Sequence, residues 1–189
     1  MMVGKPEVFA IDSHISKAYS RLSFRALGYF TIFIKGIRYG VCEPDATMLA
    51  CSLDEVERRL SCRGKHVAPR FERRSAAEIA EIFRNHFYLI GVDEEGHASR
   101  RECDEDVFYS NNIVWAPDGD EAFDDGSYVL QFDIKNEVRL IGFKSRENAL
   151  FDPPTLTDLV LQADEFYTVL KQWREQFLIE WEALPKHAD

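Results

Sequence analysis

The sequence predicts an α+β fold, with a mixed, mainly antiparallel sheet covered on one face by helices, including a long C-terminal helix. Two pairs of strand-like segments are each joined by a short turn, at residues 24–41 and 128–144. Between these pairs, two shorter stretches carry apolar residues at helical spacing. A longer apolar stripe closes the chain, at steps of three or four residues: Tyr167, Leu170, Trp173, Phe177, Trp181 and Leu184.

The composition is that of a globular protein. The 189 residues are 46% hydrophobic and 30% charged, so we expect a single α+β domain over residues 1–189. A transmembrane helix needs about 20 apolar residues, which no stretch approaches, and the N-terminal residues do not resemble a secretory signal. The four cysteines lack CxxC spacing and are expected to be reduced thiols. We therefore expect a cytoplasmic protein without a structural metal.

The first predicted strands follow from alternating residues. Residues 8–15 alternate as a first strand. Residues 24–34 are apolar on both faces, which indicates a central strand. Lys35 and Gly36 then form a tight turn into residues 37–41, which completes a hairpin.

Two helix starts are marked by a serine followed three residues later by a glutamate, at Ser52 with Glu55 and at Ser75 with Glu78. Gly64 is expected to end the first helix. Each start is followed by an apolar face at helical spacing, with Leu53, Val56 and Leu60 in the first helix and Ile79, Ile82, Phe83 and Phe87 in the second.

The second half of the chain predicts a further hairpin and the final helix. Residues 107–109 and 113–115 are expected to be short strands. Residues 128–134 alternate, which predicts that Val129, Gln131 and Asp133 face outward, and residues 137–144 return as the partner strand. Residues 159–161 are a candidate edge strand. Asp164 is expected to cap the last helix, in which Trp173 and Phe177 should be buried.

The net charge of −10 comes from one segment. Residues 91–126 contain twelve acids and two bases, whereas the rest of the chain has 21 of each. We expect this acidic, loop-rich segment to be an elaboration of the domain. It argues against nucleic acid or an anionic membrane as the main partner. The basic stretch at residues 58–74 is expected to pair with it or to be solvated.

The acidic segment is also the predicted partner-binding site. Acidic groups around aromatic side chains suit a basic protein partner, although a charge run can also be merely solvated. The predicted binding residues are Asp93, Glu94, Glu95, Glu102, Asp104, Glu105, Asp106, Phe108, Tyr109, Trp115, Asp118, Asp120, Glu121, Asp124 and Asp125, with Trp115 the first candidate for an apolar anchor.

Catalytic motifs do not stand out in the sequence. The phosphate-binding patterns GxGxxG and GxxxxGK[ST] and the nucleophile pattern GxSxG do not occur. Cys103 and His97 could form a nucleophilic pair, but neighbouring acids disfavour a thiolate. Residues 118–126 fail the EF-hand pattern because Ala122 and Phe123 occupy its fifth and sixth positions. We expect no catalytic residues, no cofactor and no bound metal.

Four segments occur in an order that resembles a known family: Phe9-Ala-Ile-Asp, the strand pair at residues 28–40, Glu57-Arg-Arg-Leu, and Ala163-Asp-Glu-Phe-Tyr-Thr-Val-Leu-Lys-Gln-Trp. This order resembles immunity proteins of bacterial polymorphic-toxin systems, of the group called immunity protein 42. The resemblance covers the first and last thirds of the chain and leaves residues 63–125 unmatched. It implies a cytoplasmic protein that neutralises a cognate toxin by binding, without catalytic residues.

Two other function classes stay open from the sequence. The first is a small-molecule or peptide-binding module with a cleft beside the sheet. The second is an enzyme built from scattered carboxylates and His86, although a histidine beside an apolar helix face is more typical of the edge of a core.

Overall fold

The structure, a computed structural model, describes residues 1–88, 105–115, 121–146 and 151–187. Its first sheet has the strand order β1-β2-β3-β4, with β5 paired to β3 and β9 paired to β2. All of these pairs are antiparallel except β2 with β9. The strands are β1 (Met2–Lys5), β2 (Phe9–Tyr19), β3 (Ala26–Ile34), β4 (Ile37–Tyr39), β5 (Thr47–Met48) and β9 (Lys186–His187).

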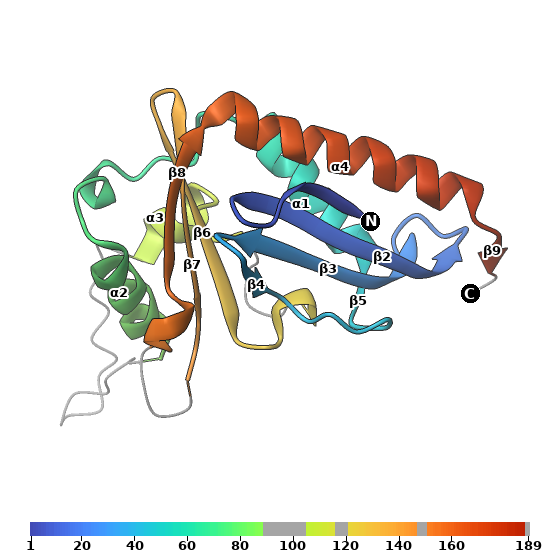
Figure 1. Cartoon of the computed structure of the whole chain (residues 1–189), viewed down its shortest axis with the longest axis horizontal. Coiled ribbons are helices and arrows are strands. Elements are labelled where there is room, and N and C mark those ends of the chain that lie inside the picture. Colours follow the sequence, from blue (N-terminus) through green and yellow to red (C-terminus); the bar gives the residue numbers. More distant parts are fainter. Residues whose placement is uncertain (89–104, 116–120, 147–150, 188–189) are drawn as a thin grey trace.

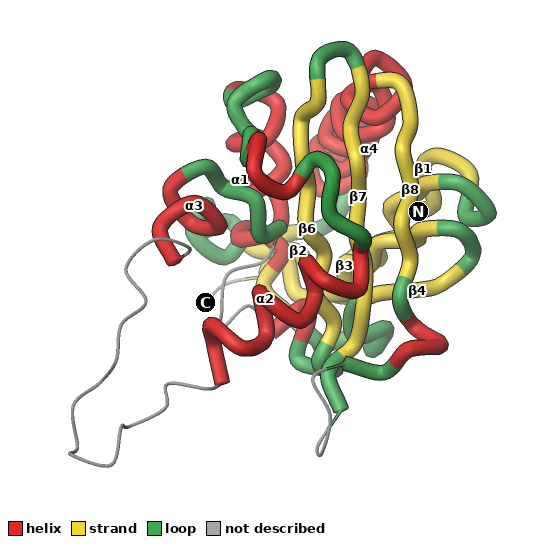
Figure 2. Tube along the Cα trace, turned by 90° about the vertical axis from the view of Figure 1, so that its left-hand side faces the viewer, coloured by secondary structure: helices red, strands yellow, loops and turns green. Residues whose placement is uncertain are grey.

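The second sheet is an antiparallel meander with the strand order β6-β7-β8. Its strands are β6 (Ser127–Ile134), β7 (Glu137–Lys144) and β8 (Thr157–Gln162). Figure 1 shows this sheet upright at one end of the molecule, where the hairpin ends of the first sheet meet it. Figure 2 shows its three strands side by side.

The helices cover the two sheets separately. They are α1 (Leu49–Ser61), α2 (Ala76–Tyr88), α3 (Glu105–Ser110) and α4 (Ala163–Ala183), with single turns η1 (Pro69–Phe71), η2 (Glu121–Phe123) and η3 (Pro153–Thr155). The long helix α4 runs along the first sheet, where it packs on β1 and β2, while α1 packs on β3 and against α4. The α2 and α3 helices lie beside the second sheet (Figure 1).

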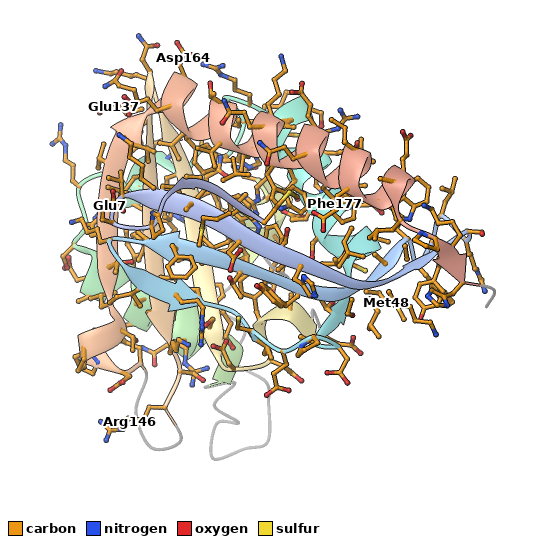
Figure 3. The ribbon with its side chains drawn as sticks, turned by 45° about the vertical axis from the view of Figure 1, so that its right-hand side comes forward. Glu7, Met48, Glu137, Arg146, Asp164 and Phe177 are labelled. Atoms are coloured by element: carbon orange, nitrogen blue, oxygen red, sulfur yellow. The ribbon has the colours of Figure 1, made fainter. Side chains whose placement is uncertain are left out.

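Two apolar clusters form the core. The larger cluster lies between the first sheet, α1 and α4, and includes Trp173 and Phe177, both fully buried as predicted. Figure 3 shows Phe177 between α4 and the strands below it. The smaller cluster lies between the second sheet and α2 with α3, and consists largely of aromatic rings: Phe71, Phe83, Phe108, Phe132 and Phe143.

The two sheets are joined by Tyr39, at the end of β4. Its ring lies against Gly142 of β7, where a Cβ atom would come within 2.5 Å of the ring. Its hydroxyl donates a hydrogen bond to the Thr155 carbonyl at 2.6 Å and lies 2.8 Å from the Thr157 hydroxyl. Only glycine at position 142 leaves room for the Tyr39 ring. This glycine of β7 therefore allows the first sheet to pack closely against the second.

The predicted α+β fold is confirmed, including both hairpins and the long C-terminal helix. Lys35 and Gly36 both have positive φ, of 51° and 82°, as a two-residue type I′ turn requires. Ser75 caps α2 as predicted: its hydroxyl accepts from the Glu78 backbone N–H at 3.3 Å, and Glu78 accepts from the Ser75 N–H at 2.8 Å.

Several local predictions are wrong. The first helix begins at Leu49, so Ser52 and Glu55 are buried residues inside it and do not form a capping box. Asp164 does not cap α4, whose N-cap residue is Gln162, and instead pairs with Arg63 at 2.5 Å. Residues 107–109 belong to the helix α3 and not to a strand, because Phe108 turns inward against α2 and η1.

Candidate functional site

The structure describes the side chains of six predicted partner-binding residues: Phe108, Tyr109, Trp115, Glu121, Asp124 and Asp125. The other nine lie outside the described side chains, and their role stays a prediction: Asp93, Glu94, Glu95, Glu102, Asp104, Glu105, Asp106, Asp118 and Asp120.

Trp115 and Phe108 are core residues, so their prediction as exposed anchors is wrong. Trp115 is 1% exposed, and its ring packs edge-on against Phe166 at 5.9 Å between centroids. Phe108 stacks on Phe71 at 5.0 Å. Tyr109, next to Phe108 in α3, is 40% exposed, and its role in binding stays a prediction.

Exposed acids gather where η2 lies beside the β4–β5 connection. The Val41 N–H donates to the Ala122 carbonyl at 2.8 Å, which holds the two segments together. Glu121 at the start of η2 and Asp124 directly after η2 are exposed, and Glu43 and Asp45 are exposed on the connection. No ion pair joins any of these four acids to another described residue. We call these four residues the η2 face.

Asp125 differs from its acidic neighbours because it has partners. One of its carboxylate oxygens pairs with Lys144 Nζ at 2.5 Å, and the other accepts from the Ser127 N–H at 3.2 Å. It therefore fixes the start of β6, and its charge is partly neutralised within the chain.

A buried arginine, Arg59 of α1, anchors the backbone of residues 112–114, which lie within the acidic segment. Its guanidinium donates to the Asn112 carbonyl at 3.1 Å and to the Val114 carbonyl at 2.5 Å. It also donates to Gln131 Oε1 at 3.0 Å, and it pairs with Glu55 at 2.8 Å. Burial lowers the pKa of Arg59, and Glu55 opposes this shift, so the guanidinium stays charged.

The same buried network continues into α4 through Asp133 and Tyr167. The Tyr167 hydroxyl donates to the Asp133 carboxylate at 3.0 Å, and Gln131 Nε2 donates to Asp133 Oδ1 at 3.0 Å. Burial raises the pKa of Tyr167, with the Asp133 charge acting in the same direction. Val129, Gln131 and Asp133 were predicted to face outward, which is wrong, because all three are buried. Side chains from α1 and α4 contact that face of β6.

His66 adds a second anchor to the same segment. Its Nδ1 lies 3.0 Å from the Asn112 carbonyl and 3.2 Å from the Asn111 carbonyl, so Nδ1 carries the proton. The other ring nitrogen is buried and has no hydrogen-bond partner within the described part of the chain. Burial lowers the pKa of His66, and the nearby Arg59 charge lowers it further, so a neutral ring fits this site.

These buried polar residues were not singled out from the sequence. Arg59 and His66 belong to the basic stretch at residues 58–74, which was expected to pair with acids or to be solvated. They bond mainly to backbone carbonyls of residues 111–114 instead. The only local pattern that could have indicated the network is the four-residue spacing of Glu55 and Arg59, which places them on one helix face.

A surface hollow of about 530 Å³ lies on the face of the second sheet that is opposite to Gln131 and Asp133. The α2 helix covers another part of this same face. Its apolar floor includes Ile134 and Val160, and Val160 is 51% exposed. Its rim carries three arginines and three acids: Arg73, Arg74, Arg139, Glu72, Glu137 and Asp158. Figure 3 labels Glu137, one of these acids, near Asp164 at the start of α4.

The described ranges carry neither a metal-binding cluster nor a membrane-spanning helix. These ranges contain no group of three or more His, Cys, Asp or Glu side chains placed to hold a metal ion. Cys42, Cys51 and Cys62 form no disulfide there, and Cys103 lies outside the described residues, as does His97. Within the same ranges, no helix is long and apolar enough to cross a membrane.

Comparison with known proteins identifies the family. A family model described as immunity protein 42 matches residues 1–176. The chain belongs to the immunity protein 42 family. Membership of this family identifies the chain as a toxin-neutralising immunity protein, as the resemblance in its sequence implied.

A solved structure shares the fold of this immunity protein. It is the crystal structure of CdiI from Burkholderia dolosa AUO158, with a TM-score of 0.60 and 19% sequence identity. The match covers 93% of this chain and 99% of that chain, so it extends through both sheets. The search of curated proteins gives no significant match.

Proposed function

We propose that this protein neutralises its cognate toxin by forming a direct, non-catalytic complex in the cytoplasm, and that the toxin approaches the acidic segment together with the η2 face. The observation that carries this proposal is the charge distribution. The whole net charge of −10 belongs to residues 91–126, while the rest of the chain is balanced. Glu121 and Asp124, in the described part of that segment, are exposed beside Glu43 and Asp45.

Such a surface favours a toxin with a basic face. Toxin domains that act on nucleic acid need basic residues to hold phosphates, and an acidic surface can occupy the same basic residues. Exposed charges act over about 8 Å at physiological salt, so they raise the association rate more than they strengthen the final contact. We therefore expect association above the neutral range of about 10⁵–10⁶ M⁻¹s⁻¹ at low salt.

The test is stopped-flow association with the toxin domain encoded beside this gene, at several salt concentrations. One variant combines Glu121→Gln and Asp124→Asn, and a second changes Asp104, Glu105 and Asp106 to Asn, Gln and Asn. The control matched to the first variant is Glu165→Gln with Glu182→Gln, because it removes two exposed negative charges from α4, on another face.

We expect both acidic-segment variants to slow association and to flatten its salt dependence, with the α4 control close to the wild type. Equal association rates for all four proteins, or a rate that does not change with salt, would exclude the acidic segment as the approach surface. Direct binding would then have to use a different face of this protein.

A further inference from the structure

The second sheet has one closed edge and one open edge. The outer edge of β6 is closed by other parts of the chain: Trp115 N–H donates to the Val129 carbonyl at 2.8 Å, and Asp133 N–H donates to the His66 carbonyl at 2.7 Å. At the other edge, β8 pairs with β7 only. Within the described residues, no further backbone hydrogen bond reaches residues 157–162. The backbone groups of β8 that point away from β7 are therefore open.

This open edge lacks the usual features that prevent strand addition. Edge strands are commonly blocked by lysine, proline or a bulge, or are kept very short. The edges of the first sheet follow this rule, because β1 has four residues and ends in Lys5, and β4 has three residues. β8 is six residues long, contains no lysine, proline or bulge, and pairs with β7 in continuous register. Its one charged residue, Asp158, is paired with Arg139 of β7 within the sheet.

The hollow beside β8 offers a place for one side chain of an added strand. Its floor includes the exposed Val160, and its rim has no net charge. Arg139 stiffens the rim: its guanidinium bonds both oxygens of Asp158, at 2.9 and 2.8 Å, and donates to the Arg74 carbonyl at 3.0 Å. A strand therefore finds a preformed surface, with little ordering of side chains needed on binding.

We propose that β8 accepts an extended strand of the cognate toxin, with an aliphatic side chain of that strand packed over Val160 in the hollow. This inference rests on the proposed function for the identity of the partner. Open backbone donors and acceptors in a row are satisfied by another strand and not by a small molecule. A second copy of this chain fits less well, because a stable dimer buries about 800 Å² on each partner and this edge exposes one large apolar side chain.

The two surfaces then have separate kinetic roles. The acidic segment acts at long range and sets the association rate. The β8 edge carries no net charge on its rim, acts at short range and sets the dissociation rate.

The test compares Val160→Lys with Ile179→Lys. Both residues are exposed aliphatic side chains, 51% and 68% exposed, and Ile179 lies on α4 away from the second sheet. Lysine at 160 places a charge at the edge and in the hollow. We expect the complex of Val160→Lys with the toxin domain to dissociate at least about tenfold faster than wild type, with association within about twofold. Ile179→Lys should match the wild type in both rates.

A second measurement uses the unmodified protein. Hydrogen exchange of residues 157–162 should slow when the toxin domain binds, because the outward N–H groups of β8 gain partners. A complex that forms and neutralises the toxin without protecting these residues overturns the strand addition and leaves the proposed function standing. Absence of any complex overturns both proposals. If the free wild-type chain is a dimer and Val160→Lys is a monomer, the β8 edge binds a second copy of the chain, and the inference is overturned.

Discussion

Replacing Arg59 by methionine tests the buried network that holds residues 112–114 of the acidic segment. Methionine keeps most of the side-chain volume but removes the bonds to the Asn112 and Val114 carbonyls and to Gln131, and it takes away one ionic partner of Glu55. Removing one member of a buried, hydrogen-bonded ion pair costs about 3–5 kcal/mol. We expect Arg59→Met to lower the free energy of unfolding by that amount.

Urea unfolding followed by tryptophan fluorescence measures this loss, because Trp115 and Trp173 are buried and become exposed on unfolding. Arg58→Met is the matched control: Arg58 is its half-exposed neighbour and also pairs with Glu55, at 3.2 Å, so its loss should cost at most about 1 kcal/mol. The double variant Glu55→Leu with Arg59→Met should be more stable than Arg59→Met alone. A loss below about 1 kcal/mol for Arg59→Met would refute the anchoring role.

Three further predictions concern stability. Trp173→Ala should cost about 3–5 kcal/mol in urea unfolding, and Trp173→Phe clearly less; a cost below about 1 kcal/mol for the alanine variant contradicts the packing of α4. Ser75→Ala should cost about 1 kcal/mol through the lost cap of α2, whereas Ser75→Asp should keep it; equal stability of all three proteins excludes the cap. Because the folded-state pKa of His66 lies below its unfolded value, the unfolded state binds more protons just below pH 6.5. Stability should therefore fall as pH drops through that value, and this fall should be smaller in His66→Asn; parallel pH profiles would contradict the neutral ring.

The hairpins could be predicted from sequence because local signals agree with the final structure there. Residues 24–34 are apolar on both faces and are followed by the turn residues Lys35-Gly36, and in the second hairpin Lys135 also has a positive φ, of 57°. The cap of α2 is equally local, since Ser75 and Glu78 bond to each other. In these elements the sequence needs no distant partner to fix the conformation.

Other elements depend on contacts that a single sequence does not display. Residues 107–109 are β-branched or aromatic, as in a strand, but contacts of Phe108 with Phe71 and Phe83 accompany a helix there, α3. Gln131 and Asp133 read as solvent-facing because they are polar, yet Arg59 and Tyr167 satisfy them inside the protein. Polar residues are buried only where partners meet them, and these partners come from helices distant in the sequence.

The candidate site was also only partly predictable from the sequence. Charge counting located the acidic segment, and Glu121 and Asp124 are exposed there. It could not show that Trp115 points inward, because an aromatic residue among acids fits both a surface anchor and a core residue. The sequence predicted β8 as an edge strand but not the hollow beside it. The hollow is formed by residues 72–75 together with β6 and β7, which are distant from β8 or from one another in the sequence.

The most direct test of the account is to co-express this protein with the toxin domain encoded beside its gene and to score both growth and complex formation. Neutralisation by direct binding predicts that growth is restored and that the two proteins purify together as a defined complex, with the toxin domain chemically unchanged. A toxin domain that still arrests growth, or growth restored without a complex or with a covalently altered toxin, would contradict neutralisation by direct binding.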